Sequence, residues 1–133
     1  MPERYVLDAS AGVEILNRTP TGFALAKRTF ERGAEEWTVE HFHLEVAKVI
    51  RRDVLRGQVS EKHADTLIDG LVRWPLNTVR VAPLLPEAWT MRHNITIHDA
   101  LYVALARHLN ATLITGDRRL ANAPGLNVAV IQE

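Results

Sequence analysis

One apolar helix followed closely by one apolar strand constrains this chain more than any other feature. Ala100 to Ala106 is an unbroken apolar run rich in helix-forming residues, and Asp99 lies in the opening turn of that helix. Leu113 to Gly116 predicts a short buried strand with a sharp turn, and Asp117 follows at once. Both elements are too apolar to lie in water. Each carries a carboxylate at one end, and burying that group costs free energy unless something binds it.

The rest of the chain alternates short apolar strands with helices. The patterns predict strands at 5–7, 36–39, 79–81 and 128–131, helices at 9–16, 23–32, 41–56, 61–74 and 83–93, and a turn region at 118–122. Such alternation indicates an α/β fold with a mainly parallel sheet. Parallel sheets present ligand sites at the carboxyl ends of their strands, and Asp8 and Asp117 both follow strands. We therefore expect these two side chains at the same edge of the sheet.

Length and composition narrow the class of protein. A chain of 133 residues suits one domain with one core, so we expect a single domain over residues 1–133. The net charge of zero lacks the basic excess of a strong nucleic-acid binder, but it allows an enzyme that touches RNA locally. The absence of cysteine excludes disulfides and thiolate chemistry. No signal pattern or long apolar run occurs, so we expect a soluble, cytoplasmic protein with no membrane partner.

Glu45 stands out by its position on a predicted helix. The apolar stripe of this helix lies at offsets 0, 4, 7 and 8, and consists of Phe42, Val46, Val49 and Ile50. Glu45 is at offset 3, on the same stripe, where a purely structural sequence would have an aliphatic residue. A glutamate at the edge of the stripe, with a packed stem and a solvated carboxylate, explains this position equally well when it is taken alone.

The other acids also have structural explanations. Asp8 and Asp117 would cap a helix or set a turn, and Asp99 would complement a helix dipole. The combination with Glu45 favours a site, because all four acids fall at element ends or on a buried stripe. The parallel layout would bring them to one edge of the sheet.

Four converging carboxylates require either protons or a cation. Two carboxylates about 4 Å apart repel each other by about 4 kcal/mol at an effective dielectric constant of about 20. Oxygen ligands select hard ions, so Mg²⁺ or Mn²⁺ is the expected occupant. One or two such ions would activate water for phosphodiester hydrolysis and offset charge on the leaving oxygen.

Four segments, in this order, resemble the PIN-domain ribonucleases, and they are most similar to the VapC-type toxins of bacterial and archaeal toxin–antitoxin pairs. The segments are Val6 to Ser10, Leu44 to Ala47, His98 to Ala106 and Leu113 to Leu120. The resemblance covers nearly the whole chain in length and motif order. It implies a PIN-like fold of three layers, in which helices flank a central, mainly parallel sheet.

The same resemblance implies an endoribonuclease that cleaves RNA with bound Mg²⁺ or Mn²⁺. The family's metal-binding, catalytic acids correspond to Asp8, Glu45, Asp99 and Asp117, and its supporting hydroxyls correspond to Ser10 and Thr115. The resemblance also implies a homodimer and a cognate VapB-type antitoxin, which wraps the toxin and often places a basic side chain in the acidic site. One departure is Glu40 to His43, where many relatives carry a proline before the acid.

Polar residues near the acids have two interpretations. His98, Arg118 and Arg119 would contact RNA in a nuclease, but a solvated charged rim explains them equally well. The alternative function is a catalytically silent PIN-like binding module that docks a protein or RNA partner. Loss of one or two acids would be the signature of such a module, and the sequence keeps all four.

The run from Ala100 to Ala106 also bears on assembly. Because it is apolar on nearly all sides, it must be covered from more than one direction. A chain of this length has few helices to spare for that cover. We therefore expect a second copy to contribute, in agreement with the homodimer that the resemblance implies.

Overall fold

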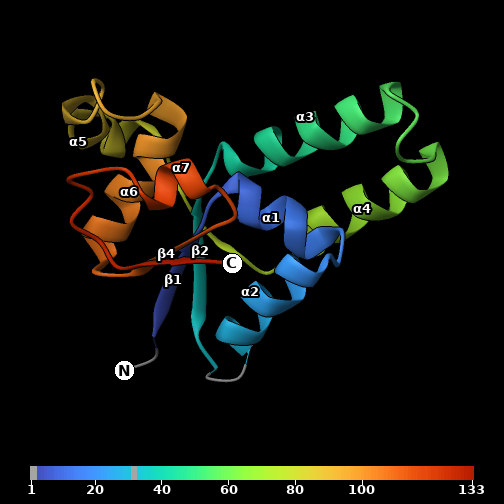
Figure 1. Cartoon of the computed structure of the whole chain (residues 1–133), viewed down its shortest axis with the longest axis horizontal. Coiled ribbons are helices and arrows are strands. Elements are labelled where there is room, and N and C mark those ends of the chain that lie inside the picture. The colour runs from blue at the N-terminus through green and yellow to red at the C-terminus, as the bar shows by residue number, and fades with distance from the viewer. Residues whose placement is uncertain (1–2, 31–32) are drawn as a thin grey trace.

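Five short strands form one parallel sheet in the computed structural model, which describes residues 3–30 and 33–133 (Figure 1). The strands are β1 (Arg4–Leu7), β2 (Glu35–Val39), β3 (Asn77–Val79), β4 (Thr112–Thr115) and β5 (Val130–Gln132). Their order across the sheet is β3-β2-β1-β4-β5, and each neighbouring pair is parallel. Their carboxyl ends therefore meet at one edge of the sheet, toward the top of Figure 1.

Helices cover both faces of this sheet, which confirms the predicted three-layer α/β fold. One layer contains α1 (Ala9–Leu16), α2 (Pro20–Phe30), α3 (Phe42–Leu55) and α4 (Glu61–Arg73). The other contains the 3₁₀ turn η1 (Ala82–Leu84), α5 (Leu85–Thr90) and α6 (Ile97–Leu109). The short helix α7 (Arg118–Ala121) packs on β4 and β5. None of the helices in the described part of the chain is long and apolar enough to cross a membrane.

The central strands and α6 make the core. Val6 and Leu113 are fully buried because both faces of β1 and β4 are covered. Helix α6 packs on β1, β2 and β4 and is flanked by α5 and η1, so each residue from Ala100 to Ala106 is buried within the single chain. The expectation that a second copy must help to cover this helix is therefore wrong, because the chain's own elements cover it.

Helix α2 begins at Pro20, earlier than the sequence pattern predicts. Thr19 Oγ1 accepts a hydrogen bond from Gly22 N (2.9 Å), and Pro20 takes a first-turn position, where its missing N–H costs little. A Cβ on Gly22 would lie 2.0 Å from the carbonyl oxygen of Glu14, so this glycine lets α1 and α2 approach closely. The predicted end of the helix falls at 31–32, outside the described residues.

The edge strands differ most from prediction. β3 ends at Val79 because Val81 already takes a helical conformation at the start of η1. β5 begins only at Val130, after Asn127 has turned the chain with a left-handed backbone (φ 55°). The predicted turn region at 118–122 contains α7, and the helix predicted at 83–93 is divided into η1 and the shorter α5.

Candidate active site

Asp8 lies where β1 ends and α1 begins. Its Oδ1 accepts hydrogen bonds from Ala11 N (2.9 Å) and Ser10 Oγ (2.7 Å), so the side chain caps α1. Thr115 Oγ1 donates to Oδ2. Asp8 is only 2% exposed. This burial raises the pKa of Asp8 to about 6, and the hydrogen bonds offset only part of that effect.

Ser10 and Thr115 join the end of β1 to the end of β4. Ser10 Oγ accepts a hydrogen bond from Gly116 N (2.9 Å), and Thr115 Oγ1 accepts one from Asp117 N (3.0 Å). The two hydroxyl oxygens are 3.2 Å apart, and both donate to Asp8. These bonds fix the relative position of the two turns that carry Asp8 and Asp117.

Asp117 and Asp99 lie at the beginning of two other helices. Asp117 Oδ1 accepts a hydrogen bond from Arg119 N (2.9 Å) and caps α7. Asp99 lies in the first turn of α6, where its N–H donates to Thr96 Oγ1 (3.2 Å). Burial and the nearby charges of Asp117 and Glu45 raise the pKa of Asp99. Asp99 therefore lies close enough to Asp117 and Glu45 for their negative charges to disfavour its ionised form.

Glu45 lies in the first turn of α3 and reaches across to α6. Tyr102 Oη donates a hydrogen bond to its Oε1 (2.8 Å), and His41 Nε2 lies 3.1 Å from the same oxygen. Burial alone would raise the pKa of Glu45, but the contacts with His41 and Tyr102 lower it overall. Burial and the charge of Glu45 raise the pKa of Tyr102, so its hydroxyl remains a donor.

These four carboxylates line one pocket of about 210 Å³, which Ser10 and Tyr102 also line. The structure therefore brings together Asp8, Glu45, Asp99 and Asp117, which come from four different parts of the sequence. Thr115 is fully buried behind Asp8.

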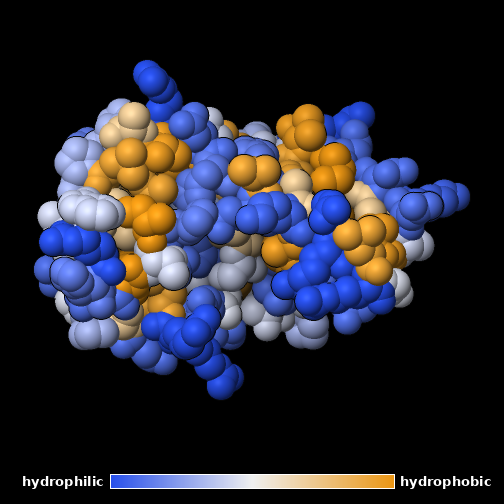
Figure 2. Space-filling view, turned by 90° about the horizontal axis from the view of Figure 1, so that it is seen from above, coloured by the Kyte–Doolittle hydropathy of each residue, from blue (hydrophilic) through white to orange (hydrophobic). Residues whose placement is uncertain are grey.

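A neighbouring hollow of about 480 Å³ shares Asp99 and Asp117 with the acidic pocket. Its walls also include Arg92, His93 and Arg119. Among the described residues, neither His98 nor Arg118 lines either space. Figure 2 looks down on this edge of the sheet and shows hydrophilic residues in the middle, between hydrophobic groups toward both ends.

The donor set fits a hydrated hard cation. In the part of the chain that the structure describes, no three His, Asp or Glu side chains are arranged to hold an ion directly. Mg²⁺ usually keeps several waters and takes one or two carboxylates from the protein. The pocket of about 210 Å³ has room for such waters, at about 30 Å³ each. Carboxylate and hydroxyl oxygens select Mg²⁺ or Mn²⁺ over softer metals.

Comparison with known proteins places this arrangement in a family. The family model described as PIN domain matches residues 5–126. The chain belongs to the PIN-domain family. Ribonuclease VapC12 of Mycobacterium tuberculosis (strain ATCC 25618 / H37Rv) is 37% identical to this PIN domain over 125 residues, which cover 94% of this chain and 95% of the relative. The resemblance found in the four sequence segments is confirmed.

Solved structures share the fold of this PIN domain. PAE2754 from Pyrobaculum aerophilum has a TM-score of 0.74 at 18% sequence identity, and the alignment covers 99% of this chain and 92% of that one. VapBC2 from Rickettsia felis, bound to a DNA fragment from its promoter, has a TM-score of 0.70 at 15% identity, with 98% of each chain covered. At these identities the likeness concerns the fold and not the activity.

Sequence reasoning assigned no role to two residues that contact the acids of this PIN domain. Tyr102 lies three positions after Asp99 on α6, and His41 lies four positions before Glu45. Side chains at these spacings share one face of a helix, so the spacing was an available signal. The contact between Tyr102 and Glu45 joins residues 57 positions apart in the sequence, so no local pattern reveals it.

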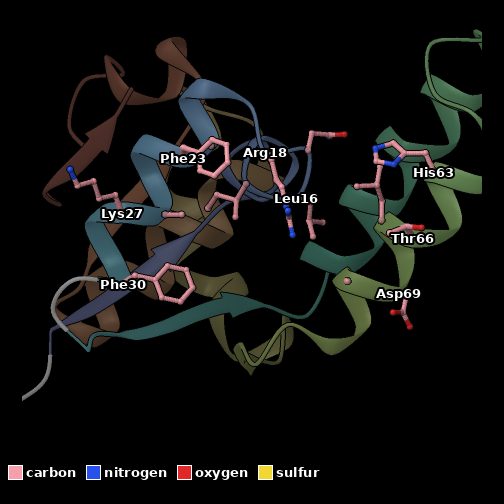
Figure 3. Close-up of a pocket in the computed structure, with 14 residues that line it drawn as sticks. Leu16, Arg18, Phe23, Lys27, Phe30, His63, Thr66 and Asp69 are labelled. Carbon is pink, nitrogen blue, oxygen red and sulfur yellow. The ribbon is translucent and has the colours of Figure 1, made fainter.

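A larger groove of about 1030 Å³ lies between α2 and α4 (Figure 3). Phe23 and Phe30 of α2 line it and are 63% and 77% exposed. His63, Thr66 and Asp69 of α4 lie on the opposite side. Two exposed aromatic rings beside a polar rim are typical of surfaces that bind another protein.

Proposed function

We propose that this PIN domain is a metal-dependent endoribonuclease that hydrolyses RNA phosphodiester bonds and acts as the toxin of a toxin–antitoxin pair. The observation that carries the proposal is the convergence of the four acids on one pocket at the carboxyl edge of the sheet. The ribonuclease named among its relatives supports the same activity. The proposed unit is a single domain over residues 1–133.

The four acids would contribute in different ways. Glu45, whose pKa is lowered, offers a carboxylate that stays ionised throughout the neutral range. Asp8 is held in one orientation by two hydroxyls and one backbone N–H. Asp99 and Asp117 border both hollows, so they would lie between the pocket and a bound RNA strand. A bound Mg²⁺ or Mn²⁺ would activate water and offset charge on the leaving oxygen.

RNA must approach an acidic pocket that repels its phosphates. Arg119 and Arg92 line the adjoining hollow, where they would attract the strand and hold it beside Asp99 and Asp117. Such local contacts suit a chain whose net charge is zero, because they need no basic excess over the whole surface. His98 and Arg118 would contact RNA only outside these two hollows.

The decisive experiment measures RNA cleavage by the purified protein in EDTA, and again after Mg²⁺ or Mn²⁺ is restored. We expect cleavage only with metal. A folded Asp99→Asn variant should lose about 100-fold or more of its cleavage rate, because the assigned acid no longer offers a negative charge to the ion. RNA that is bound but never cut, with any metal, would refute the nuclease. That outcome would support the catalytically silent binding module.

The proposal includes inhibition by a cognate VapB-type antitoxin, which the likeness to VapBC2 supports. Clustered carboxylates attract a guanidinium or ammonium group as they attract a metal, so an inserted basic side chain would displace the ion. We place an apolar segment of this partner in the groove lined by Phe23 and Phe30. An antitoxin that inhibits equally well after its basic residues near the site become alanine would contradict this mechanism.

A homodimer is also part of the proposal. Leu85 and Trp89 of α5 are 40% and 60% exposed and offer an apolar surface that a second copy would cover. Light scattering should give a dimeric mass at micromolar concentration. A monomeric mass under these conditions would refute the homodimer but would not bear on the proposed nuclease activity.

A further inference from the structure

Two donors from different helices converge on one oxygen of Glu45. Tyr102 Oη, on α6, lies 2.8 Å from Oε1, and His41 Nε2, just before α3, lies 3.1 Å from the same atom. Among the described residues, none donates a hydrogen bond to Oε2. Glu45 also lines the acidic pocket. One carboxylate oxygen is therefore held while the other remains available.

The surroundings of His41 define which ring nitrogen carries the proton. Nε2 lies 3.1 Å from Glu45 Oε1 and 3.3 Å from the carbonyl oxygen of His98, and both of these atoms are acceptors. Nε2 must therefore carry a hydrogen. Nδ1 is buried and has no hydrogen-bond partner. The hydrogen on Nε2 is therefore the one that holds Glu45 Oε1.

The His41 ring is itself fixed in place. It packs against the Tyr102 ring with the centroids 4.6 Å apart, and the centroid of the His98 ring lies 5.8 Å from that of His41. The two donors thus support each other through ring contact as well as through their shared acceptor.

We propose that His41 and Tyr102 are positioning residues, which clamp Glu45 through Oε1 and present Oε2 to the metal in the acidic pocket. The proposal rests on the proposed function, because it assigns Glu45 to the same metal-dependent site. A long glutamate side chain would otherwise populate several rotamers, and only some of them direct a free oxygen into the pocket. Groups that orient a metal ligand in this way typically change metal affinity by about 10- to 100-fold when they are removed.

The test compares variants that remove or keep each donor. Tyr102→Phe removes only the hydroxyl, and His41→Leu removes the ring donor. His41→Gln keeps an N–H near the position of Nε2, whereas His41→Asn places its amide near the position of the unpartnered Nδ1. His43→Gln is the matched control, because His43 lies on the same helix and contacts Phe42 rather than the acids.

The first readout is Mn²⁺ binding without RNA, followed by electron paramagnetic resonance or calorimetry. Tyr102→Phe, His41→Leu and His41→Asn should each weaken Mn²⁺ binding by about 10-fold, whereas His41→Gln and His43→Gln should stay within about threefold of the wild type. Far-ultraviolet circular dichroism should be unchanged throughout. Nuclease activity of the weakened variants should recover when Mn²⁺ is raised to saturation, because the chemistry of the ion itself is intact.

The second readout is a long-range ¹H–¹⁵N spectrum of the histidine rings in the metal-free protein. It should show a hydrogen on His41 Nε2, which faces Glu45 Oε1. A His41 Nε2 without a hydrogen would overturn the clamp. Mn²⁺ affinity that is unchanged in Tyr102→Phe and His41→Leu would also overturn it. A wild-type protein that binds Mn²⁺ as expected but cuts no RNA would refute the proposed nuclease and leave the clamp standing.

Discussion

Replacing Asp8 with asparagine should stabilise the metal-free protein at neutral pH, although it should also remove the activity. Burial raises the pKa of Asp8 from 3.8 to about 6. At pH 7 the folded state therefore carries a buried charge that the unfolded chain would hold in water. A rise of about 2 pKa units corresponds to about 3 kcal/mol of lost stability, at about 1.4 kcal/mol for each unit.

The asparagine side chain can keep the hydrogen bonds that hold Asp8. Its carbonyl oxygen would accept from Ala11 N and Ser10 Oγ, as Oδ1 does now. Its amide N–H would donate to Thr115 Oγ1, which currently donates to Oδ2. Asparagine also caps helices as well as aspartate does. The substitution should therefore remove the buried charge without losing the cap, and most of the electrostatic penalty should be recovered.

The sign of the pH dependence follows from the raised pKa. Between about pH 4 and pH 6, folded Asp8 still binds a proton that the unfolded chain has released, so the stability of the wild type falls as pH rises. Above this window the full free-energy cost of burying the ionised carboxylate is present, and below it this cost is absent. The stability difference between Asp8→Asn and the wild type should grow from near zero at about pH 4 to about 3 kcal/mol at pH 7.

The assay is urea denaturation in EDTA at several pH values, with Asp65→Asn as the control. Asp65 is exposed on α4, far along the chain from the pocket residues, so its replacement should give no comparable trend. Restoring Mg²⁺ should stabilise the wild type and not Asp8→Asn, because only the wild type keeps the assigned ligand. If Asp8→Asn were less stable at pH 7, or its advantage did not depend on pH, the reasoning about the buried charge would fail.

Two further predictions test the RNA-facing hollow and the packing of α2. Arg119→Ala should raise KM for RNA several-fold and weaken its salt dependence. Arg118→Ala should have a smaller effect on both, because Arg119 lines the hollow and Arg118 does not. Steady-state kinetics at two salt concentrations would distinguish the two variants. Gly22→Ala should lower the free energy of unfolding by about 2 kcal/mol or more, because its Cβ would meet the carbonyl oxygen of Glu14 at 2.0 Å. Chemical denaturation measures that loss, and a neutral result would contradict the close packing of α1 and α2.

The central strands and α6 were predictable because the residues of each element by themselves favour its secondary structure. β1 and β4 each contain a short apolar run, as strands covered on both faces do, and α6 carries an apolar run rich in helix-forming residues. The edge strands were less predictable, because the end of an edge strand is set by where its single partner stops pairing. Val81 has the composition of a strand residue but belongs to the start of η1.

The convergence of the acids was predictable from topology, but the support around them was not. Parallel strands put Asp8 and Asp117 at one edge. The helix patterns pointed to Glu45 and Asp99, and the resemblance then implied the same four acids. The hydrogen bond from Tyr102 to Glu45 joins residues 57 positions apart, so no local pattern reveals it. The contact between His41 and Glu45 is local, at a spacing of four residues. The expectation that a second copy covers α6 was wrong for a related reason. Sequence periodicity shows that α6 must be covered but not which elements cover it.

The capping role of Asp8 does not by itself explain why the residue is an aspartate. The cap needs an oxygen that accepts from Ala11 N, and asparagine or serine supplies one without a charge. Burial makes the charge costly, since it raises the pKa of Asp8 to about 6. A position that keeps a carboxylate where a neutral residue would give a more stable protein is most simply explained by a ligand that needs the charge. The same reasoning applies to Asp99, whose pKa is raised by burial and by neighbouring carboxylates, while Thr96 already caps its helix.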